Sequence, residues 1–232
     1  MSDTFIYRPP VQPYLPVLHA DEYLVVVNKP SGLLSVPGRL PEYRDSAATR
    51  MQRVYPRAQA IHRLDMDTSG LLLFALSPMA QKAIGRQFEK RLVEKRYDAL
   101  VWGCPAAQEV KLPLRCDWPN RPRQMVDHEL GKAAHTSVRP LASDGRISHV
   151  ALFPHTGRSH QLRVHLLHLG CPILGDRLYA GERAPGHPRL MLHASSIRVR
   201  HPADGAWCEW HAPLPAAMGE LSAQLAPWAE AG

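Results

Sequence analysis

The densest group of polar side chains in the sequence stands directly before a run of apolar residues. It fills residues 62–70, and the apolar run 71–76 follows it. Polar residues at the mouth of a buried strand are well placed to form a site on a rigid scaffold. Asp65 and Asp67 could supply the two carboxylates of a hydrolase that acts on nucleosides or glycosides. The residues alone equally allow an ion pair between Arg63 and Asp65 beside an ordinary turn.

A second polar group, at 155–165, joins the end of a predicted strand to the start of a predicted helix. Gly157 lets the backbone approach another group closely at this turn, and a helix N-terminus favours a nearby anion. Arg163 flanks the apolar stripe of the helix and could reach a partly buried carboxylate. If that carboxylate is Asp65, the guanidinium lowers its pKa and keeps it ionised. A solvated basic edge of the helix is the alternative.

Three histidines on the same predicted helix raise the question of a metal site. They are His160, His165 and His168, but only the last two share a face closely, and no HExxH pattern accompanies them. We therefore expect no metal here. The three histidines are expected to make hydrogen bonds in the core or to contact phosphate.

A tyrosine near the start of a predicted strand is a third candidate. In Lys95-Arg96-Tyr97 the ring of Tyr97 offers a flat face for a base, and its hydroxyl can donate or accept a hydrogen bond. A tyrosine that packs at a strand edge has the same local sequence. The residues alone favour that packing role.

The strands and helices that must hold these groups can be predicted from apolar periodicity. Helices do not alternate regularly with strands, so the pattern predicts an α+β fold with a mixed, largely antiparallel central sheet flanked by helices and loops. We expect one compact domain at 17–232, preceded by an extended, proline-rich arm at 1–16. Strands are expected at 23–28, 71–76, 95–102, 135–141, 147–153, 190–200 and 207–211, and helices at about 45–55, 77–91 and 159–169.

The composition favours a polyanionic partner. The formal charge is +7 and the pI is near 9.5, and arginine and lysine release counterions when they meet phosphates, so nucleic acid is the first candidate. The apolar run 71–76 is far too short to cross a bilayer, and the N-terminus lacks the pattern of a signal peptide. We expect a cytoplasmic protein with no membrane partner. The four scattered cysteines favour reduced thiols.

Six short segments, in a fixed order, carry a resemblance to a known enzyme family. Together they resemble the RluA family of pseudouridine synthases over roughly residues 12–213. The resemblance implies a single catalytic domain that isomerises uridine to pseudouridine in structured RNA. The segments are Asn28-Lys29-Pro30-Ser31-Gly32, His62-Arg63-Leu64-Asp65 with Thr68-Ser69-Gly70, Lys95-x-Tyr97, Gly157-Arg158-x-His160-Gln161-Leu162-Arg163, Leu174-Gly175-Asp176 and Leu192-His193-Ala194.

The resemblance also assigns roles to four residues. Asp65 matches the essential carboxylate, which either attacks C1′ of the ribose or removes a ribose proton so that a glycal forms. Tyr97 matches the tyrosine that stacks on the target base, and Arg163 matches the arginine that pairs with the aspartate. Arg63 matches the side chain that enters the RNA stack while the uridine is extruded. The reaction changes no oxidation state and adds no atoms, so we expect no cofactor and no metal.

Within this family, segments 28–39 and 116–122 are most similar to members without an appended S4 RNA-binding domain, for which the chain has no room before residue 20. The resemblance implies two substrates, a loop of 23S ribosomal RNA and the anticodon stem-loop of certain tRNAs, and we expect a monomer. The alternative is a non-catalytic RNA-binding or RNA-folding protein on the same scaffold. The intact set of Asp65, Tyr97 and Arg163 argues against it.

Overall fold

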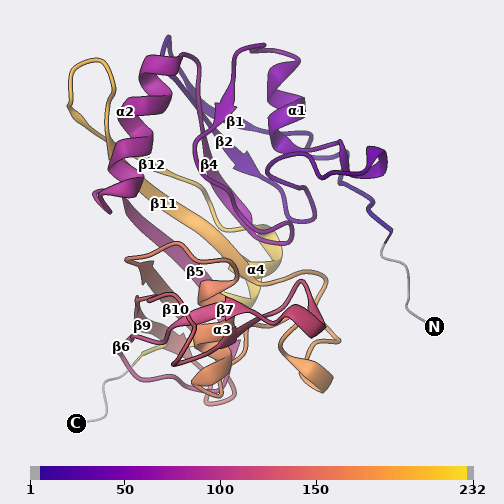
Figure 1. Cartoon of the computed structure of the whole chain (residues 1–232). Coiled ribbons are helices and arrows are strands. Elements are labelled where there is room, and N and C mark those ends of the chain that lie inside the picture. The colour runs from indigo at the N-terminus through magenta and orange to yellow at the C-terminus, as the bar shows by residue number, and fades with distance from the viewer. Residues whose placement is uncertain (1–5, 229–232) are drawn as a thin grey trace. The chain divides into compact units, whose positions relative to one another are not determined.

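The computed structural model describes residues 6–228, which form two compact units (Figure 1). The first unit comprises the described residues up to Val93 together with Arg198–Ala212, and the second comprises Glu94–Ile197 with the residues from Pro213 on. Strand β11 (Leu192–Arg200) carries the chain from the second unit back into the first. Helices and antiparallel strands build both units, and the predicted α+β class is confirmed. Within residues 6–228, no helix has the length and apolar character needed to span a membrane.

The first unit is an antiparallel sheet flanked by two helices (Figure 1). Every residue of its β4 strand is buried, as the apolar run at 71–76 predicts. Alternate apolar residues of β2 and β4 share a core cluster with helix α1, and α2 contacts β4. The elements are β1 (Val17–Ala20), β2 (Leu24–Lys29), β3 (Gln59–Ala60), β4 (Ser69–Ala75), β12 (Trp207–His211), a 3-10 turn (Pro41–Tyr43), α1 (Ala47–Gln52) and α2 (Pro78–Glu89).

Both helices of this unit begin at side chains that satisfy free backbone N–H groups. The Ser46 hydroxyl accepts the N–H of Thr49, and the Thr49 hydroxyl accepts the N–H of Ser46, which makes a capping box at α1. Ser77 accepts the N–H of Ala80 and Pro78 occupies the first turn of α2, as the Ser77-Pro78 sequence predicts.

The described part of the proline-rich arm, residues 6–16, is bonded to the first unit. Arg50 of α1 is 2% exposed, and its guanidinium donates to the carbonyl oxygens of Tyr14 and Pro10. The same guanidinium makes two bonds to Asp45, at 2.9 and 2.7 Å, and the Tyr7 hydroxyl donates to the Asp45 carbonyl. Residues 1–5 of the predicted arm lie outside the described residues.

The second unit is also built on antiparallel strands. In it, β5 (Glu94–Trp102) pairs with β10 (Ile147–Pro154), which pairs with β9 (Thr136–Ser143). Its core cluster includes Leu162 and Leu166 of helix α3 and Met218 of α4. The remaining elements are β6 (Gln108–Val110), β13 (Ala226–Pro227), α3 (Gln161–His168), α4 (Ala216–Ser222), the separate pair β7 (Leu114–Cys116) and β8 (Gln124–Val126), and 3-10 turns at Trp118–Asn120 and Gly181–Arg183.

The predicted helices at 45–55, 77–91 and 159–169 correspond to α1, α2 and α3. Helix α4 and the β7–β8 hairpin were not predicted. Strands β7 and β8 have three residues each, too few to show a two-residue alternation of apolar and polar side chains. Helix α4 has only seven residues, which is too short for a clear helical period.

Candidate active site

Asp65 lies in the first unit, in the loop that leads into strand β4. The adjacent Leu64 is 4% exposed and anchors the loop, while Arg63 is exposed and Asp65 is half-buried. The N–H of Thr68 donates to the Asp65 carbonyl at 3.2 Å, which closes the turn before the strand. The loop therefore has a buried anchor between two accessible charged side chains, as a site at the mouth of a buried strand requires.

Lys29, the last residue of strand β2, holds this loop in place. Lys29 is fully buried, and its ammonium donates to the carbonyls of Pro30, Leu33 and Met66 at 2.9, 2.7 and 2.9 Å. The register of β2 and β4 places Lys29 opposite Gly70, so the ammonium reaches the loop from the neighbouring strand end. A buried ammonium needs such partners because desolvation is otherwise costly. The lysine therefore ties the loop to β2.

Two serines and a glycine complete this attachment. Ser35, 3% exposed, donates its hydroxyl to the Leu64 carbonyl at 2.8 Å and accepts the Leu64 N–H at 2.9 Å. Ser31 donates to the carbonyl of Asp67, and the N–H of Gly32 donates to Met66. The Asn28–Gly32 segment is one of the six segments of the resemblance. Its structural role is to hold the backbone of the Asp65 loop.

His62, at the start of the loop, has a packing role. Its Nε2 atom accepts the N–H of Leu73 at 3.2 Å, and its ring stacks on Phe88 of α2 with centroids 4.9 Å apart. An imidazole whose Nε2 accepts a backbone N–H is neutral with its proton on Nδ1. His62 therefore links the loop to β4 and α2.

Arg163 and Asp176 form a buried ion pair in the second unit. Nε of Arg163 lies 2.8 Å from Oδ2 of Asp176, and Nη2 lies 2.7 Å from Oδ1. The residues are 3% and 1% exposed. Two parallel bonds of this kind fix the plane of the guanidinium as well as its position. Asp176 was not among the predicted site residues, although its Leu174-Gly175-Asp176 segment is part of the resemblance.

The backbone around Asp176 explains the glycine that precedes it. Gly175 has a φ of +72°, and a Cβ at this position would lie 1.9 Å from the carbonyl oxygen of Arg189. Asp176 Oδ1 also accepts the N–H groups of Leu178 and Tyr179, at 3.0 and 3.2 Å. Its carboxylate therefore holds both the following turn and the Arg163 side chain.

Tyr179 connects this ion pair to other parts of the second unit. The guanidinium carbon of Arg163 lies 5.1 Å from the centroid of its ring, within reach of a cation–π contact. Its hydroxyl is 2.7 Å from His160 Nδ1 and accepts the N–H of Gln124 at 2.7 Å. Arg163, Tyr179 and the β7–β8 hairpin thus form one bonded network.

Most of the polar residues around Gly157 hold the turn before α3. The Gln161 Oε1 atom accepts the Thr156 hydroxyl and the Arg158 N–H, and its Nε2 donates to the His135 carbonyl. His160 has a φ of +51° at the start of the helix. The predicted polar group at 155–165 therefore combines a structural turn with the functional candidate Arg163.

Tyr97, the remaining predicted residue, is half-buried on β5 opposite Leu152 of β10. Lys95 stands two residues earlier, so the two side chains share one face of the strand. Burial lowers the pKa of Lys95. Arg63 and Asp65 thus share the loop of the first unit, and Tyr97 and Arg163 belong to the second. The predicted pairing of Arg163 with Asp65 stays a prediction.

The three histidines considered as metal ligands are His160, at the start of α3, and His165 and His168 within the helix. His165 is fully buried between the Thr136 hydroxyl and the Leu112 carbonyl, and burial lowers its pKa. Glu109, His135 and His155 form a different group whose ligand atoms all lie within 4.8 Å of one another, so these three could hold a metal ion.

Comparison with known proteins gives one consistent answer. Residues 23–168 match the RNA pseudouridylate synthase family. The chain is 53% identical over 212 residues to the Dual-specificity RNA pseudouridine synthase RluA of Escherichia coli strain K12, covering 89% of this chain and 96% of that protein. The protein of the same name from Pasteurella multocida is 52% identical over 211 residues, with the same two coverages.

A solved structure agrees with this assignment. The human RNA pseudouridylate synthase domain containing 1 superposes with a TM-score of 0.73 and 28% identity, over 98% of this chain and 92% of that chain. The matched family covers both the Asp65 loop and Arg163. The chain belongs to the RNA pseudouridylate synthase family.

Proposed function

We propose that this chain isomerises uridine to pseudouridine in two kinds of structured RNA, a loop of 23S ribosomal RNA and the anticodon stem-loop of some tRNAs. The RNA pseudouridine synthase activity itself follows from family membership. The choice of two RNA classes rests on the similarity to relatives named as dual-specificity enzymes. RNA loops with unstacked bases are also what most sequence-specific RNA-binding proteins contact.

The Asp65 loop is the observation that carries the assignment. Its backbone is bonded to Lys29, Ser31 and Ser35, while the Asp65 side chain stays half-buried and Arg63 is exposed. A catalytic carboxylate must be held in one position and still be reached by substrate. This loop meets both conditions.

Asp65 is the proposed catalytic residue. Isomerisation breaks the N1–C1′ bond of uridine, rotates the uracil and forms a C5–C1′ bond, while the C5 proton leaves. The carboxylate acts on the ribose by one of two routes, attack at C1′ or removal of the C2′ proton to give a glycal. Deuterium at C2′ separates them, because only the glycal route breaks that bond and gives a primary isotope effect.

Three further side chains have proposed roles at the substrate. Arg63, exposed beside Asp65, enters the RNA stack in place of the extruded uridine, which offsets the few kcal/mol that extrusion costs. Tyr97 stacks on the uracil. Arg163 pairs with Asp65, and its two bonds to Asp176 through Nε and Nη2 set the orientation of the guanidinium for that contact.

The proposed reaction needs neither cofactor nor metal, because substrate and product contain the same atoms at the same oxidation level. We further propose that the chain works as a monomer in the cytoplasm. Asp65, Arg63, Tyr97 and Arg163 all come from one chain, so no second copy is needed to complete the proposed site.

The test compares two carboxylates of the same loop. Asp65→Asn should bind a substrate stem-loop with unchanged affinity, yet release tritium from C5-labelled uridine at least about a thousandfold more slowly than wild type. Asp67→Asn is the matched control and should keep near-normal activity. Near-normal tritium release by Asp65→Asn would overturn the assignment.

A further inference from the structure

An exposed tryptophan lies at the tip of the β7–β8 hairpin in the second unit. Trp118 is 62% exposed, in a 3-10 turn that spans Trp118–Asn120. The guanidinium carbon of Arg121 lies 4.6 Å from the centroid of its ring. One exposed aromatic residue does not by itself mark a binding site, so its surroundings decide whether it is one.

The hairpin holds this ring in a defined place. Leu114, Arg115 and Cys116 pair with Val126, Met125 and Gln124. The turn is closed by bonds from Asp117 N–H to the Arg123 carbonyl and from Arg123 N–H to the Asn120 carbonyl, both 3.0 Å. Tyr179 attaches the hairpin to the rest of the unit through Gln124. A surface ordered before binding loses little conformational entropy on binding.

The tip carries two arginines and one carboxylate, Asp117, which accepts a bond from the Asn120 side-chain amide at 2.9 Å. In the part of the chain that the structure describes, no carboxylate pairs with Arg121 or Arg123, whereas Arg115 at the foot of the hairpin is paired with Asp127. Guanidinium groups without an acidic partner are available to phosphate oxygens.

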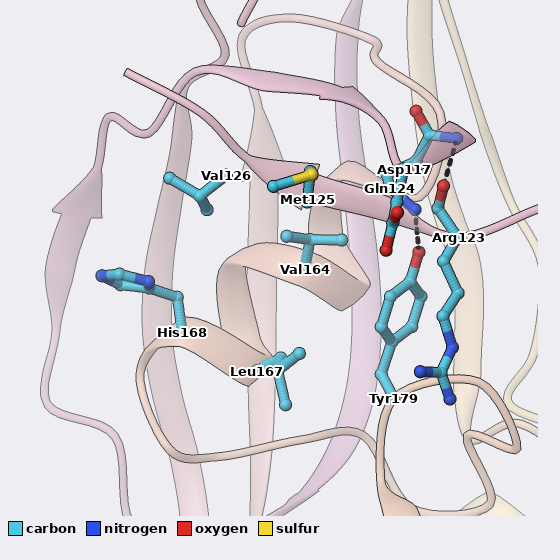
Figure 2. A pocket seen from close by; sticks show the side chains of 9 residues that line it. All are labelled: Asp117, Arg123, Gln124, Met125, Val126, Val164, Leu167, His168 and Tyr179. Carbon is cyan, nitrogen blue, oxygen red and sulfur yellow. Dashed lines mark hydrogen bonds between the residues drawn. The ribbon is translucent and has the colours of Figure 1, made fainter. Parts of the chain in front are cut away.

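A hollow of about 300 Å³ lies beside the hairpin (Figure 2). Figure 2 shows Met125, Val126, Val164 and Leu167 around it, with Tyr179 at one end and His168 at the other. Its lining is mainly apolar, and Arg123 stands at its edge. A strand of RNA that crosses the tip therefore meets an apolar surface for a base next to a donor for its phosphate.

We propose that this hairpin is a second RNA-contact site, at which an unpaired base of the substrate stacks on Trp118 and the adjoining phosphates bond to Arg121 and Arg123. The inference rests on the proposed function, because it takes the occupant to be the substrate RNA. Stacked aromatic rings beside arginines are a common platform for unpaired bases, since every base has a flat π face. The net charge of +7 favours the same occupant over a protein surface.

The first experiment measures single-turnover tritium release from a C5-tritiated stem-loop RNA over a range of enzyme concentrations. For Trp118→Ala we expect the half-saturating concentration to rise roughly tenfold, the order associated with one lost stacked base. The rate at saturation should stay within about twofold of wild type, because Trp118 is not placed at the reacting atoms. Trp118→Phe keeps a stacking face and should recover most of the loss.

Leu130→Ala is the matched control. Leu130 is another exposed large apolar side chain of the second unit, 73% exposed, and its replacement should leave both parameters unchanged. Arg121→Ala should weaken binding and lower the slope of log Kd against log salt by about one, as expected for one lost phosphate contact. Urea unfolding curves that coincide with wild type show that the variants fold.

The second experiment identifies the base. Each unpaired nucleotide of the RNA other than the target is made abasic in turn, and affinity is measured by direct binding with wild type and with Trp118→Ala. At the stacked position, the abasic change should lower the RNA affinity of wild type roughly tenfold and leave the affinity of Trp118→Ala nearly unchanged. If Trp118→Ala binds within twofold of wild type, or if every abasic change weakens both proteins equally, the inference is wrong. If the wild-type protein binds RNA but releases no tritium, the proposed function is wrong. The binding data then still test whether the hairpin contacts RNA.

Discussion

In the second unit, two bonds of 2.8 and 2.7 Å join the guanidinium of Arg163 to the carboxylate of Asp176, and both residues are almost completely buried. Asp176 lies 13 positions later in the sequence, on the loop after α3, and its two bonds help to set the orientation of the Arg163 guanidinium. If Arg163 pairs with Asp65 as proposed, Asp176 acts on that contact as a positioning residue.

Asp176→Asn should destabilise the protein strongly. Removing one charge of a buried pair takes away the two charge-assisted bonds that fix the other group, so we expect the free energy of unfolding in urea to fall by about 3–5 kcal/mol. The double variant Arg163→Met, Asp176→Leu removes both charges. Its loss of unfolding free energy should be clearly smaller than that of Asp176→Asn alone. A loss below about 1 kcal/mol for Asp176→Asn would contradict the structural importance of the pair.

Arg163 variants separate geometry from charge. Arg163→Met should lose most of its turnover at neutral pH while its RNA affinity changes little, because the residue acts on Asp65 in the proposed site. Arg163→Lys keeps the charge but cannot make both bonds to Asp176, so its activity should lie between Arg163→Met and wild type. If Arg163→Met instead weakens RNA binding strongly and keeps the wild-type single-turnover rate on saturating RNA, Arg163 is a phosphate contact.

Lys29→Met should loosen the Asp65 loop. The substitution removes the shared donor of the Pro30, Leu33 and Met66 carbonyls. Met66 keeps the N–H of Gly32, and each buried group left unsatisfied costs about 1–3 kcal/mol. We expect a lower free energy of unfolding in urea and slower single-turnover tritium release. Lys82→Met, on the exposed side of α2, is the control and should change neither. Equal behaviour of the two variants would argue against the role of Lys29.

Binding should be strongly salt-dependent. With a net charge of +7, affinity for a stem-loop should fall at least about tenfold between 50 and 200 mM salt, because bound counterions are released from the RNA. Asp65→Asn, which removes a carboxylate outside the phosphate contacts, should keep a similar slope. A flat dependence of log Kd on log salt would show that the charge is incidental.

Stability should fall in acid through Asp98. Burial raises the pKa of this carboxyl, but hydrogen bonds from His149, Arg96 and Ser195 outweigh that effect and hold it at about 2, against 3.8 for the free side chain. A lowered pKa in the folded state gives stability that is complete above pH 3.8 and is lost as pH falls to about 2.

The expected loss over that interval is about 2 kcal/mol, since each pKa unit corresponds to about 1.4 kcal/mol. Urea unfolding at pH 5, 4, 3 and 2 measures it, and Asp98→Asn should remove this part of the pH dependence. Asp204→Asn, at an exposed position, should leave the curve as in wild type. An unchanged pH dependence in Asp98→Asn would assign the acid sensitivity to other groups.

The sequence by itself determined the type of protein and indicated the segments in which the proposed site residues lie. The apolar run at 71–76 and the Ser77-Pro78 start of α2 are local signals, because periodicity and capping depend on neighbouring residues, and both appear as predicted. The Asp65 loop and Arg163 were identified because their short segments keep the order and spacing of the family. The α+β class followed from the irregular succession of strands and helices.

Only the tertiary structure decided which side chains hold these residues in place. Lys29 and Met66 are 37 positions apart, and the antiparallel register of β2 with β4 is what brings the ammonium to the loop. Asp176 reaches Arg163 because Gly175 turns the chain with a positive φ where a Cβ would collide with Arg189. Such contacts depend on packing between distant segments, which leaves no periodic signal in the sequence.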